Sequence, residues 1–573
     1  MTEAALRPAS SELAKALASC RGAFVGIGVF SGVLNILYLT GSFFMLEVYD
    51  RVLPSRSVPT LVGLAALALL LYAFQGLLDI IRGRTLQRVA RFVDDTVSLR
   101  IYRIVVRLPL LAPAARGVQP LQELDNIRSF MATVGPAALF DLPWIPLYLA
   151  ICFLFHPLIG AAATVGGLLL VGITLLTEFM TRAPAREAGA LASRRSGLAD
   201  SSRRNAEAVQ AMGMAGRLGT RWNEINQRYL DTQQRAADIA IGLGSISKVL
   251  RMVLQSAVLG IGAYLVINQQ ATAGIIIASS ILTARALAPV ELAISQWRGF
   301  VAARQSWHRL ADLLNKIPAD REPLPLPKPS HSVVLEAVTV VPPGSGRVAA
   351  HEVTFQLTAG HGLGIVGPSA SGKSSLARAI VGVWVPAAGK IRLDGAALDQ
   401  WAPEALGQHI GYLPQDMELF AGSVAQNIAR FDPRPDAESV IAAAKAAGVH
   451  ELILGLPDGY ETQIGDGGTN LSTGQRQRIG LARALYGDPF LVVLDEPNSN
   501  LDKEGDEALT QAILGVRKRG GIVIVIAHRP SALAGVDTVL VMRVGRQQAF
   551  GPLEVAQGHT TAPTPLRTSG AIA

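Results

Sequence analysis

Long apolar runs without charged residues recur through the first half of the chain, and they predict membrane-spanning helices. A helix needs about 20 apolar residues to cross a bilayer. The run at 252–284 is too long for one helix, and the polar residues at 268–270 offer a turn, so we divide it into two spans. So many runs of this kind do not fit the core of one soluble domain. The six predicted spans are 22–46, 58–78, 129–155, 157–177, 249–267 and 272–295.

Arginine is concentrated in two segments of this half, 82–128 and 182–251, and this indicates how the chain crosses the membrane. Positive residues favour the cytoplasmic side, so both segments should be cytoplasmic. They contain few helix breakers and therefore predict helices that continue beyond the bilayer, by nearly 40 Å for about 25 residues. We expect breaks in these helices near 109–122 and near 206–214.

Two charged residues fall inside the predicted spans. Asp141 interrupts the third span, which we expect to bend at Pro143 and Pro146. Arg285 falls near the middle of the sixth, and a charge at that depth must face protein or water. It either extends to the cytoplasmic surface or lines a central cavity, paired with Asp141 or with Glu291 of a second subunit.

The second half of the chain has a different pattern. Residues 1–316 form the predicted membrane domain, and 317–330 hold five prolines, which cannot form the interior of a helix and predict an extended linker. From 331 to 555, strand-like stretches such as 353–357 alternate with helical ones, which is typical of an α/β domain. The tail at 556–573 lacks periodicity and is expected to be disordered.

The composition supports a membrane protein and argues against other classes. Half of the residues are hydrophobic, 17% are charged, and the mean hydropathy is +0.34. The net charge of +8 does not indicate nucleic-acid binding, because the arginines form no single patch interleaved with aromatic residues. The two cysteines, Cys20 and Cys152, exclude a disulfide framework or a cysteine metal cluster.

A glycine-rich loop in the second half predicts a nucleotide site. It follows the buried-strand pattern of 362–366 and opens a helix, and backbone N–H groups in such a loop bind phosphate. Lys373 should reach the β- and γ-phosphates of ATP, and the Ser374 hydroxyl should ligate Mg²⁺. The loop residues expected to bind nucleotide are Gly367, Pro368, Ser369, Ala370, Ser371, Gly372, Lys373, Ser374 and Ser375.

Two carboxylates and a histidine follow apolar strand patterns farther along. Asp495 and Glu496 end the pattern of 490–494; Asp495 suits Mg²⁺, and Glu496 suits polarisation of an attacking water. His528 follows the pattern of 522–526, and we expect it to contact the γ-phosphate. Asp495 and Glu496 could instead be an acid pair at a helix N-terminus, and His528 could be structural. The preceding glycine-rich loop makes both alternatives weaker.

Two further polar segments lie between the loop and the carboxylates. Gln415 is expected to take part in catalysis and metal binding. The second segment is Leu-Ser-Thr-Gly-Gln at 471–475.

In this order, from Gly367 to His528, the motifs resemble the nucleotide-binding domain of an ATP-binding-cassette (ABC) transporter. With six preceding spans, the whole chain resembles an ABC exporter half-transporter. The segments 47–57, 141–148 and 205–214 are similar to the type I secretion permease/ATPase family, in particular its protease-exporting branch. The resemblance implies an all-α six-helix transmembrane domain followed by an α/β P-loop nucleotide-binding domain.

The resemblance also implies a homodimer with ATP and Mg²⁺ between two subunits. One subunit would supply Lys373, Gln415, Asp495, Glu496 and His528, and the other Ser472, Gly474 and Gln475, with Asp502 at the dimer seam. The helix breaks near 109–122 and 206–214 would be the elements that couple the membrane domain to the ATPase.

In such a family the exporter stands in the bacterial inner membrane, multi-pass and in contact with membrane lipid, with its ATPase domain cytoplasmic. Its partners would be a periplasmic membrane-fusion adaptor, an outer-membrane channel and a secreted, unfolded protein substrate with a C-terminal signal, such as a protease or a repeat-rich protein. No nucleic acid is expected. Some relatives carry an N-terminal peptidase-like domain, for which about 20 residues before the first span leave no room, so we expect no cargo processing.

The chain departs from the family pattern at two places. Thr473 stands where the usual motif has a glycine, and we expect its β-branched side chain to be tolerated near the phosphate interface by pointing away from it. The stretch 339–343 lacks the aromatic residue that commonly stacks on adenine, so adenine would rest on Val341 or Pro342.

Two other functions remain open at this point. An exporter of lipids or small molecules would have the same architecture and the same ATPase residues. A non-transporting membrane ABC ATPase that regulates a partner is less consistent with six spans and with an intact pair of Glu496 and His528.

Overall fold

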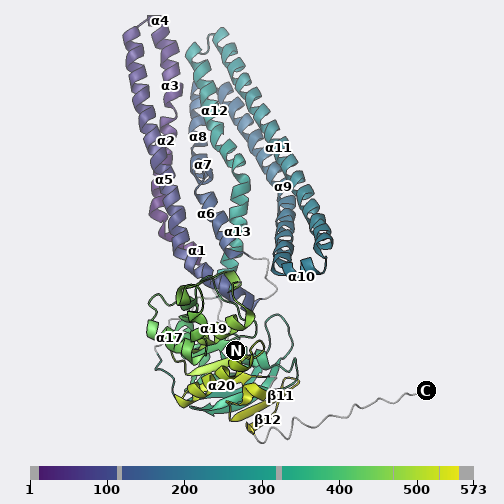
Figure 1. The fold of residues 1–573 in the computed structure, drawn as a ribbon. Coiled ribbons are helices and arrows are strands. Elements are labelled where there is room, and N and C mark those ends of the chain that lie inside the picture. The colour runs from purple at the N-terminus through teal and green to yellow at the C-terminus, as the bar shows by residue number, and fades with distance from the viewer. Residues whose placement is uncertain (1–11, 113–118, 318–325, 469, 528–529, 554–573) are drawn as a thin grey trace, which may run out of the picture. The chain divides into compact units, whose positions relative to one another are not determined.

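The computed structural model describes residues 12–112, 119–317, 326–468, 470–527 and 530–553. The chain divides near residue 319 into two compact units, the first helical and the second α/β (Figure 1). The predicted fold class is therefore confirmed. Most of the predicted linker and the whole tail at 556–573 lie outside the described residues.

The first unit contains only helices among its described residues. In chain order they are α1 (Glu12–Ser19), α2 (Arg21–Leu37), α3 (Thr40–Glu47), a π-helical turn (Val48–Val52), α4 (Leu53–Ser55), α5 (Val58–Leu111), α6 (Pro120–Met131), α7 (Gly135–Asp141), a 3₁₀ turn (Leu142–Trp144), α8 (Ile145–Phe155), α9 (Pro157–Arg204), α10 (Ala206–Ala211), α11 (Ala215–Ile267), α12 (Ala273–Ser295) and α13 (Trp297–Lys316).

Six helical stretches in the described part of the chain are long and apolar enough to cross a membrane. They are Arg21–Ser55, Val58–Leu111, Gly135–Phe155, Pro157–Arg204, Ala215–Ile267 and Ala273–Ser295. The third begins at Gly135 rather than at 129, because α6 ends at Met131 and a new helix starts with Pro136 in its first turn, a favourable position for proline. The predicted turn between the last two spans is present, with Gln269 in a left-handed conformation at φ 57°.

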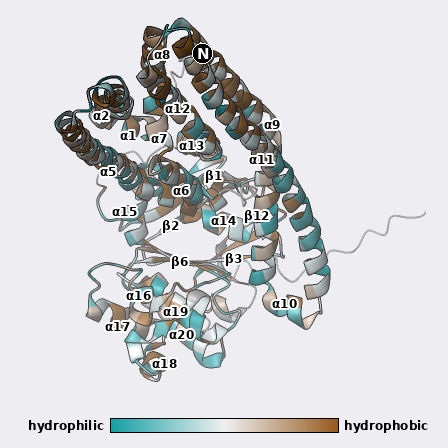
Figure 2. Cartoon of the chain, turned by 90° about the horizontal axis from the view of Figure 1, so that it is seen from above, coloured by the Kyte–Doolittle hydropathy of each residue, from teal (hydrophilic) through white to brown (hydrophobic). Residues whose placement is uncertain are grey.

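The predicted extended helices are present as α5, α9 and α11. The 53 residues of α11 correspond to a helix of about 80 Å, far longer than a bilayer requires. α9 and α11 run side by side and are joined through α10, and Figure 2 shows that both change from hydrophobic to hydrophilic toward α10. The helix breaks predicted near 109–122 and 206–214 are also present, since α5 ends at Leu111 and α10 is a separate short helix.

A cluster of buried polar side chains joins α2, α5, α7 and α8. Arg82 Nη1 donates to both carboxylate oxygens of Asp141, at 2.9 and 3.0 Å, and Asn35 Nδ2 donates to Asp141 Oδ1 at 2.9 Å. Tyr148 donates its hydroxyl to Asn35 Oδ1 at 2.8 Å, and Arg82 also donates to Ser31 Oγ at 3.1 Å. None of these five residues is more than 7% exposed. Together we call them the polar cluster.

This cluster corrects one pairing predicted for Arg285, the one with Asp141. Asp141 is paired with Arg82, not with Arg285, because Arg82 reaches it from the neighbouring helix α5. Glu291 pairs with Arg251 at 2.8 Å within the same chain. The guanidinium of Arg285 instead lies 4.9 Å from the centre of the Tyr38 ring, a cation–π arrangement.

The second unit is built on one large sheet and a small two-stranded antiparallel sheet, β7 with β8. Its strands are β1 (Ser332–Val340), β2 (Ala350–Thr358), β3 (Gly362–Val366), β4 (Ala388–Leu393), β5 (Ala396–Ala397), β6 (Ile410–Leu413), β7 (Gly422–Ser423), β8 (Gln463–Ile464), β9 (Leu491–Asp495), β10 (Ile522–Ile526), β11 (Thr538–Arg543) and β12 (Arg546–Pro552). Its α-helices are α14 (Lys373–Ile380), α15 (Pro403–His409), α16 (Val424–Ile428), α17 (Ala437–Ala446), α18 (His450–Leu454), α19 (Thr473–Leu485) and α20 (Lys503–Lys518).

The large sheet has the order β5-β4-β1-β2-β12-β11-β3-β10-β9-β6. Its neighbours β11, β3, β10, β9 and β6 pair in parallel, and the strands from β5 to β2 pair antiparallel. The strands predicted at 353–357, 362–366, 490–494 and 522–526 are present as parts or the whole of β2, β3, β9 and β10.

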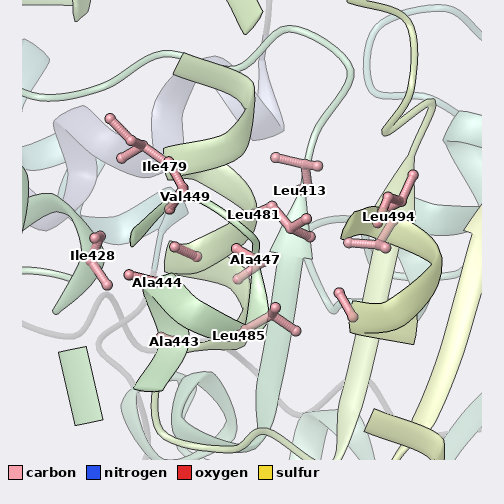
Figure 3. Packing of buried hydrophobic residues seen from close by; sticks show 14 of the residues in the cluster. Leu413, Ile428, Ala443, Ala444, Ala447, Val449, Ile479, Leu481, Leu485 and Leu494 are labelled. Atoms are coloured by element: carbon pink, nitrogen blue, oxygen red, sulfur yellow. The ribbon is translucent and has the colours of Figure 1, made fainter. Parts of the chain in front are cut away.

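Buried apolar residues cover both faces of the parallel strands. Along β10, Val523 and Val525 face one core while Ile522, Ile524 and Ile526 face the other, as expected when successive side chains alternate. Figure 3 shows the first core, where Leu481 of α19 lies near Leu413 of β6. This packing fixes α19 against the strands that end at the candidate site.

Candidate nucleotide site

The glycine-rich loop connects β3 to α14, in the strand–loop–helix arrangement that the sequence predicts. A Cβ at Gly367 would lie 2.1 Å from the carbonyl oxygen of Met542, and one at Gly372, where φ is 92°, would lie 1.9 Å from that of Ala349. Only glycine fits at these two places, so the neighbouring backbone fixes the shape of the loop. Ala370 adopts a left-handed conformation at φ 61° despite its Cβ.

Lys373 folds back over this loop. Its ammonium donates hydrogen bonds to the carbonyl oxygens of Gly367 and Pro368, each at 2.8 Å, and the residue is 5% exposed. Burial lowers the pKa of Lys373, while Glu496 and Asp495 act in the opposite direction. The ammonium thus stands inside the loop, where a phosphate group can compete for its hydrogen bonds. The Ser371 hydroxyl, also buried, has no hydrogen-bond partner among the described residues.

Asp495 lies at the end of β9 beside the start of α14. The Ser374 hydroxyl donates to Asp495 Oδ1 at 3.1 Å, while Asp495 Oδ2 has no hydrogen-bond partner within the described part of the chain. Asp495 is 1% exposed, and this burial raises its pKa, with the Ser374 hydrogen bond opposing the shift. A hydroxyl and a carboxylate with one unsatisfied oxygen form a donor set of the kind that hard divalent cations bind.

Glu496 follows directly, in a strained backbone conformation. Its φ is 52°, unusual for a residue with a Cβ, and its N–H donates to the Ile526 carbonyl at 2.9 Å. Gln415, just after β6, donates its side-chain amide to Glu496 Oε2 at 3.3 Å. The structure therefore brings together two residues that the sequence places 81 positions apart. His528 lies outside the described residues.

The segment at 471–475 forms the start of α19. Ser472 caps this helix: its hydroxyl accepts from the Gln475 N–H at 3.2 Å, and Gln475 Oε1 accepts from the Ser472 N–H at 2.9 Å. Thr473 accepts a hydrogen bond from Arg476 at 3.2 Å. Among the described residues, no hydrogen bond joins Ser472, Gly474 or Gln475 to the phosphate loop of the same chain.

Two residues of α19 that the sequence did not single out tie this helix to the segment between β9 and α20. Gln477, 8% exposed, donates to the Pro497 carbonyl at 2.6 Å and accepts from the Asn500 N–H at 3.2 Å. The sequence feature that could have pointed to Gln477 is its polar side chain within the buried stripe of α19, four residues before Leu481.

The second residue is Arg478, which pairs with Asp502 at 2.5 Å. Asp502 also caps α20 through the Gly505 N–H at 2.9 Å, and this backbone hydrogen bond lowers the pKa of Asp502.

The comparisons with known proteins give the class first. Residues 350–499 match the family model for ABC transporters, and residues 24–289 match the model for the ABC transporter transmembrane region. The chain is thus a multi-pass membrane protein with an ABC ATPase domain, and its ATP hydrolysis is coupled to transport.

The relatives define the branch. The chain is 58% identical over 564 residues to the type I secretion system ATP-binding protein PrsD of Rhizobium meliloti (strain 1021), covering 98% of this chain and 97% of the relative. It is 30% identical over 532 residues to the cyclolysin secretion/processing ATP-binding protein CyaB of Bordetella pertussis (strain Tohama I), covering 91% and 74%. The chain belongs to the type I secretion ATP-binding proteins of the ABC transporter superfamily.

A solved structure has the same fold. It is described as a bacterial Atm1-family ABC exporter with ATP bound, with a TM-score of 0.79, 23% identity, and coverage of 96% of this chain and 99% of that one.

Proposed function

We propose that this chain works as a homodimer in the bacterial inner membrane and exports unfolded proteins that carry a C-terminal signal. The observation that carries the proposal is the 58% identity to a type I secretion ATP-binding protein, which extends through both units. In the proposed assembly, a periplasmic membrane-fusion adaptor and an outer-membrane channel complete the route, and the ATPase unit is cytoplasmic.

In this proposal the phosphate loop, from Gly367 to Ser375, binds the phosphates of ATP. Lys373 exchanges its hydrogen bonds with two loop carbonyls for bonds to the β- and γ-phosphates. Ser374, Asp495 and Gln415 hold Mg²⁺, which when bound neutralises phosphate charge; the unsatisfied Asp495 Oδ2 supports this fit. Adenine rests on Val341 or Pro342, which are half-buried beside the end of β1.

Glu496 positions and polarises the attacking water. Its strained backbone and its hydrogen bond from Gln415 hold the carboxylate in a defined place, which favours general-base chemistry. His528 contacts the γ-phosphate in the same proposal.

The second subunit completes each site. A chain has one phosphate loop and one segment at 471–475, and no hydrogen bond joins them among the described residues. Ser472, Gly474 and Gln475 therefore act on the ATP of the partner, at the N-terminus of α19, where helix geometry favours an anion. Asp502 lies at the seam between the two ATPase units.

A secretion assay tests the proposal. A bacterium that lacks this gene receives either the wild-type chain or Glu496→Gln, and the medium is assayed for a reporter protein with a C-terminal secretion signal. We expect secretion only with the wild type. Secretion that is equal without the chain, or export of the reporter lacking its signal, would contradict protein export by this route.

A further inference from the structure

The membrane unit contains a partly open apolar cavity of about 410 Å³. It lies among α1, the first turn of α2, and the helices α5, α6, α7 and α13. The lining is apolar apart from one residue, Arg304, and its larger side chains are Phe24, Phe130, Phe140, Phe300 and Trp307. A cavity of this size falls within the range of ligand-binding pockets, and an apolar lining does not hold water well.

The cavity lies at one edge of the bilayer. Phe24 is three residues into the first span, which begins at Arg21, and Leu139 is four residues into the third, which begins at Gly135. Leu86 lies beyond the predicted second span (58–78), and Phe300 and Trp307 follow the sixth span, which ends at Ser295, so the lining crosses the boundary of the apolar layer. Because the arginine-rich segment 82–128 leads into the start of the third span, this edge belongs to the cytoplasmic leaflet.

Arg304 differs from the arginine five residues later on α13. Arg309 is fully engaged, donating to both carboxylate oxygens of Glu123 at 2.8 and 2.7 Å. Arg304 is exposed and has neither an ion pair nor a hydrogen bond among the described residues. Arg304 is the one charged residue among the described residues that line this cavity. Its guanidinium can donate two parallel hydrogen bonds to a phosphate group.

We propose that the cavity binds an anionic phospholipid of the cytoplasmic leaflet, with an acyl chain against the aromatic lining and the phosphate on Arg304. The apolar lining, the depth at the headgroup boundary and the arginine without a protein partner all match the two parts of such a lipid. The bound lipid would join α1 and α13 to the first and third spans. This inference does not depend on what the protein exports.

Three variants separate the two halves of the proposed contact. Ala303→Trp fills the cavity at a buried lining position, and Arg304→Glu reverses the charge at its edge. Arg298→Glu is the matched control, since Arg298 is also an exposed arginine of α13 but does not line the cavity. Each full-length protein is purified in detergent, and the retained phosphatidylglycerol and phosphatidylethanolamine are measured by mass spectrometry.

We expect the wild type and Arg298→Glu to retain phosphatidylglycerol selectively. Arg304→Glu should reduce its retention about ten-fold or more, because charge-assisted hydrogen bonds are lost. Ala303→Trp should reduce the retention of both lipids. If Ala303→Trp does not fold, the loss of selectivity in Arg304→Glu against Arg298→Glu still decides the question.

Two results would overturn the proposal. One is equal retention of both lipids in the wild type and in Arg304→Glu. The other combines two observations: Arg304→Cys forms a disulfide between two chains in intact membranes, and Arg304→Glu retains lipid as the wild type does. Together these would mean that the cavity is a contact between subunits.

Discussion

Asp141 in the membrane unit and Asp495 in the ATPase unit are both almost fully buried, at 6% and 1% exposure, yet their surroundings differ. Asp141 accepts hydrogen bonds on both oxygens from Arg82 and another from Asn35. Asp495 accepts one hydrogen bond, from Ser374, and its second oxygen has no partner among the described residues. A buried carboxylate with all its bonds made within the chain acts as structure, whereas one with a bond left open is available to a ligand.

The first and largest expected effect concerns the completed network. Arg82→Leu leaves the Asp141 carboxylate buried without its cation, and loss of one partner of a buried pair costs about 3–5 kcal/mol. We expect low expression and a strongly lowered thermal unfolding midpoint in detergent. The double variant Arg82→Leu/Asp141→Leu should recover much of this loss, because it removes both charges. Equal stability of Arg82→Leu and wild type would mean that Asp141 is not held by this pair.

The second effect concerns turnover in the ATPase unit. Glu496→Gln keeps the hydrogen bond from Gln415 but cannot accept a proton, so kcat should fall at least about 100-fold, equivalent to about 2.7 kcal/mol. ATP binding should persist in a filter or fluorescence assay, whereas Lys373→Ala should weaken the binding itself. Near-normal ATP hydrolysis by Glu496→Gln would rule out Glu496 as the base.

The third prediction is a gain in stability on substitution, whereas the first is a loss. Burial raises the pKa of Asp495, so its contribution to stability is fully present at low pH and is lost as the pH rises through the folded-state pKa. At neutral pH the buried charge is therefore unfavourable, and Asp495→Asn should stabilise the nucleotide-free protein. A gain near 1 kcal/mol would raise the unfolding midpoint of the ATPase unit by about 2–4 °C. The matched variant Asp141→Asn should lower stability, and a loss of stability in both would remove the distinction between the two sites.

The sequence predicts these two regions to different degrees. The phosphate loop and its flanking strand and helix are local features, because motif spacing and apolar runs determine them over a few residues. Arg82 and Asp141 are 59 positions apart, and many arginines on either side were equally plausible partners, so only the arrangement of the helices in space selects one. The hydrogen bonds of Gln477 to residues 497 and 500 depend in the same way on where α19 packs. The start of the third span at Gly135 was missed because the residues before it are also apolar.

The smallest effect concerns backbone strain, which separates the two regions again. None of the five residues of the polar cluster has a positive φ, but Ala370 in the phosphate loop does, at 61°, and so does Glu496. For a residue with a Cβ this conformation costs roughly 1–2 kcal/mol, and glycine removes that cost while adding roughly 0.4–1 kcal/mol of unfolded-state entropy. Ala370→Gly should therefore stabilise the nucleotide-free protein by less than about 1 kcal/mol.

The matched control for this last effect is the neighbouring exposed residue Ser369, whose φ is not positive. Ser369→Gly removes no strain and adds the same unfolded-state entropy, so it should lower the unfolding midpoint slightly. Differential scanning fluorimetry of both variants without nucleotide measures the two shifts. Shifts of the same sign would mean that the loop relaxes around Ala370. The ATP site would then differ from the polar cluster in its unsatisfied hydrogen-bonding groups and not in backbone strain at Ala370.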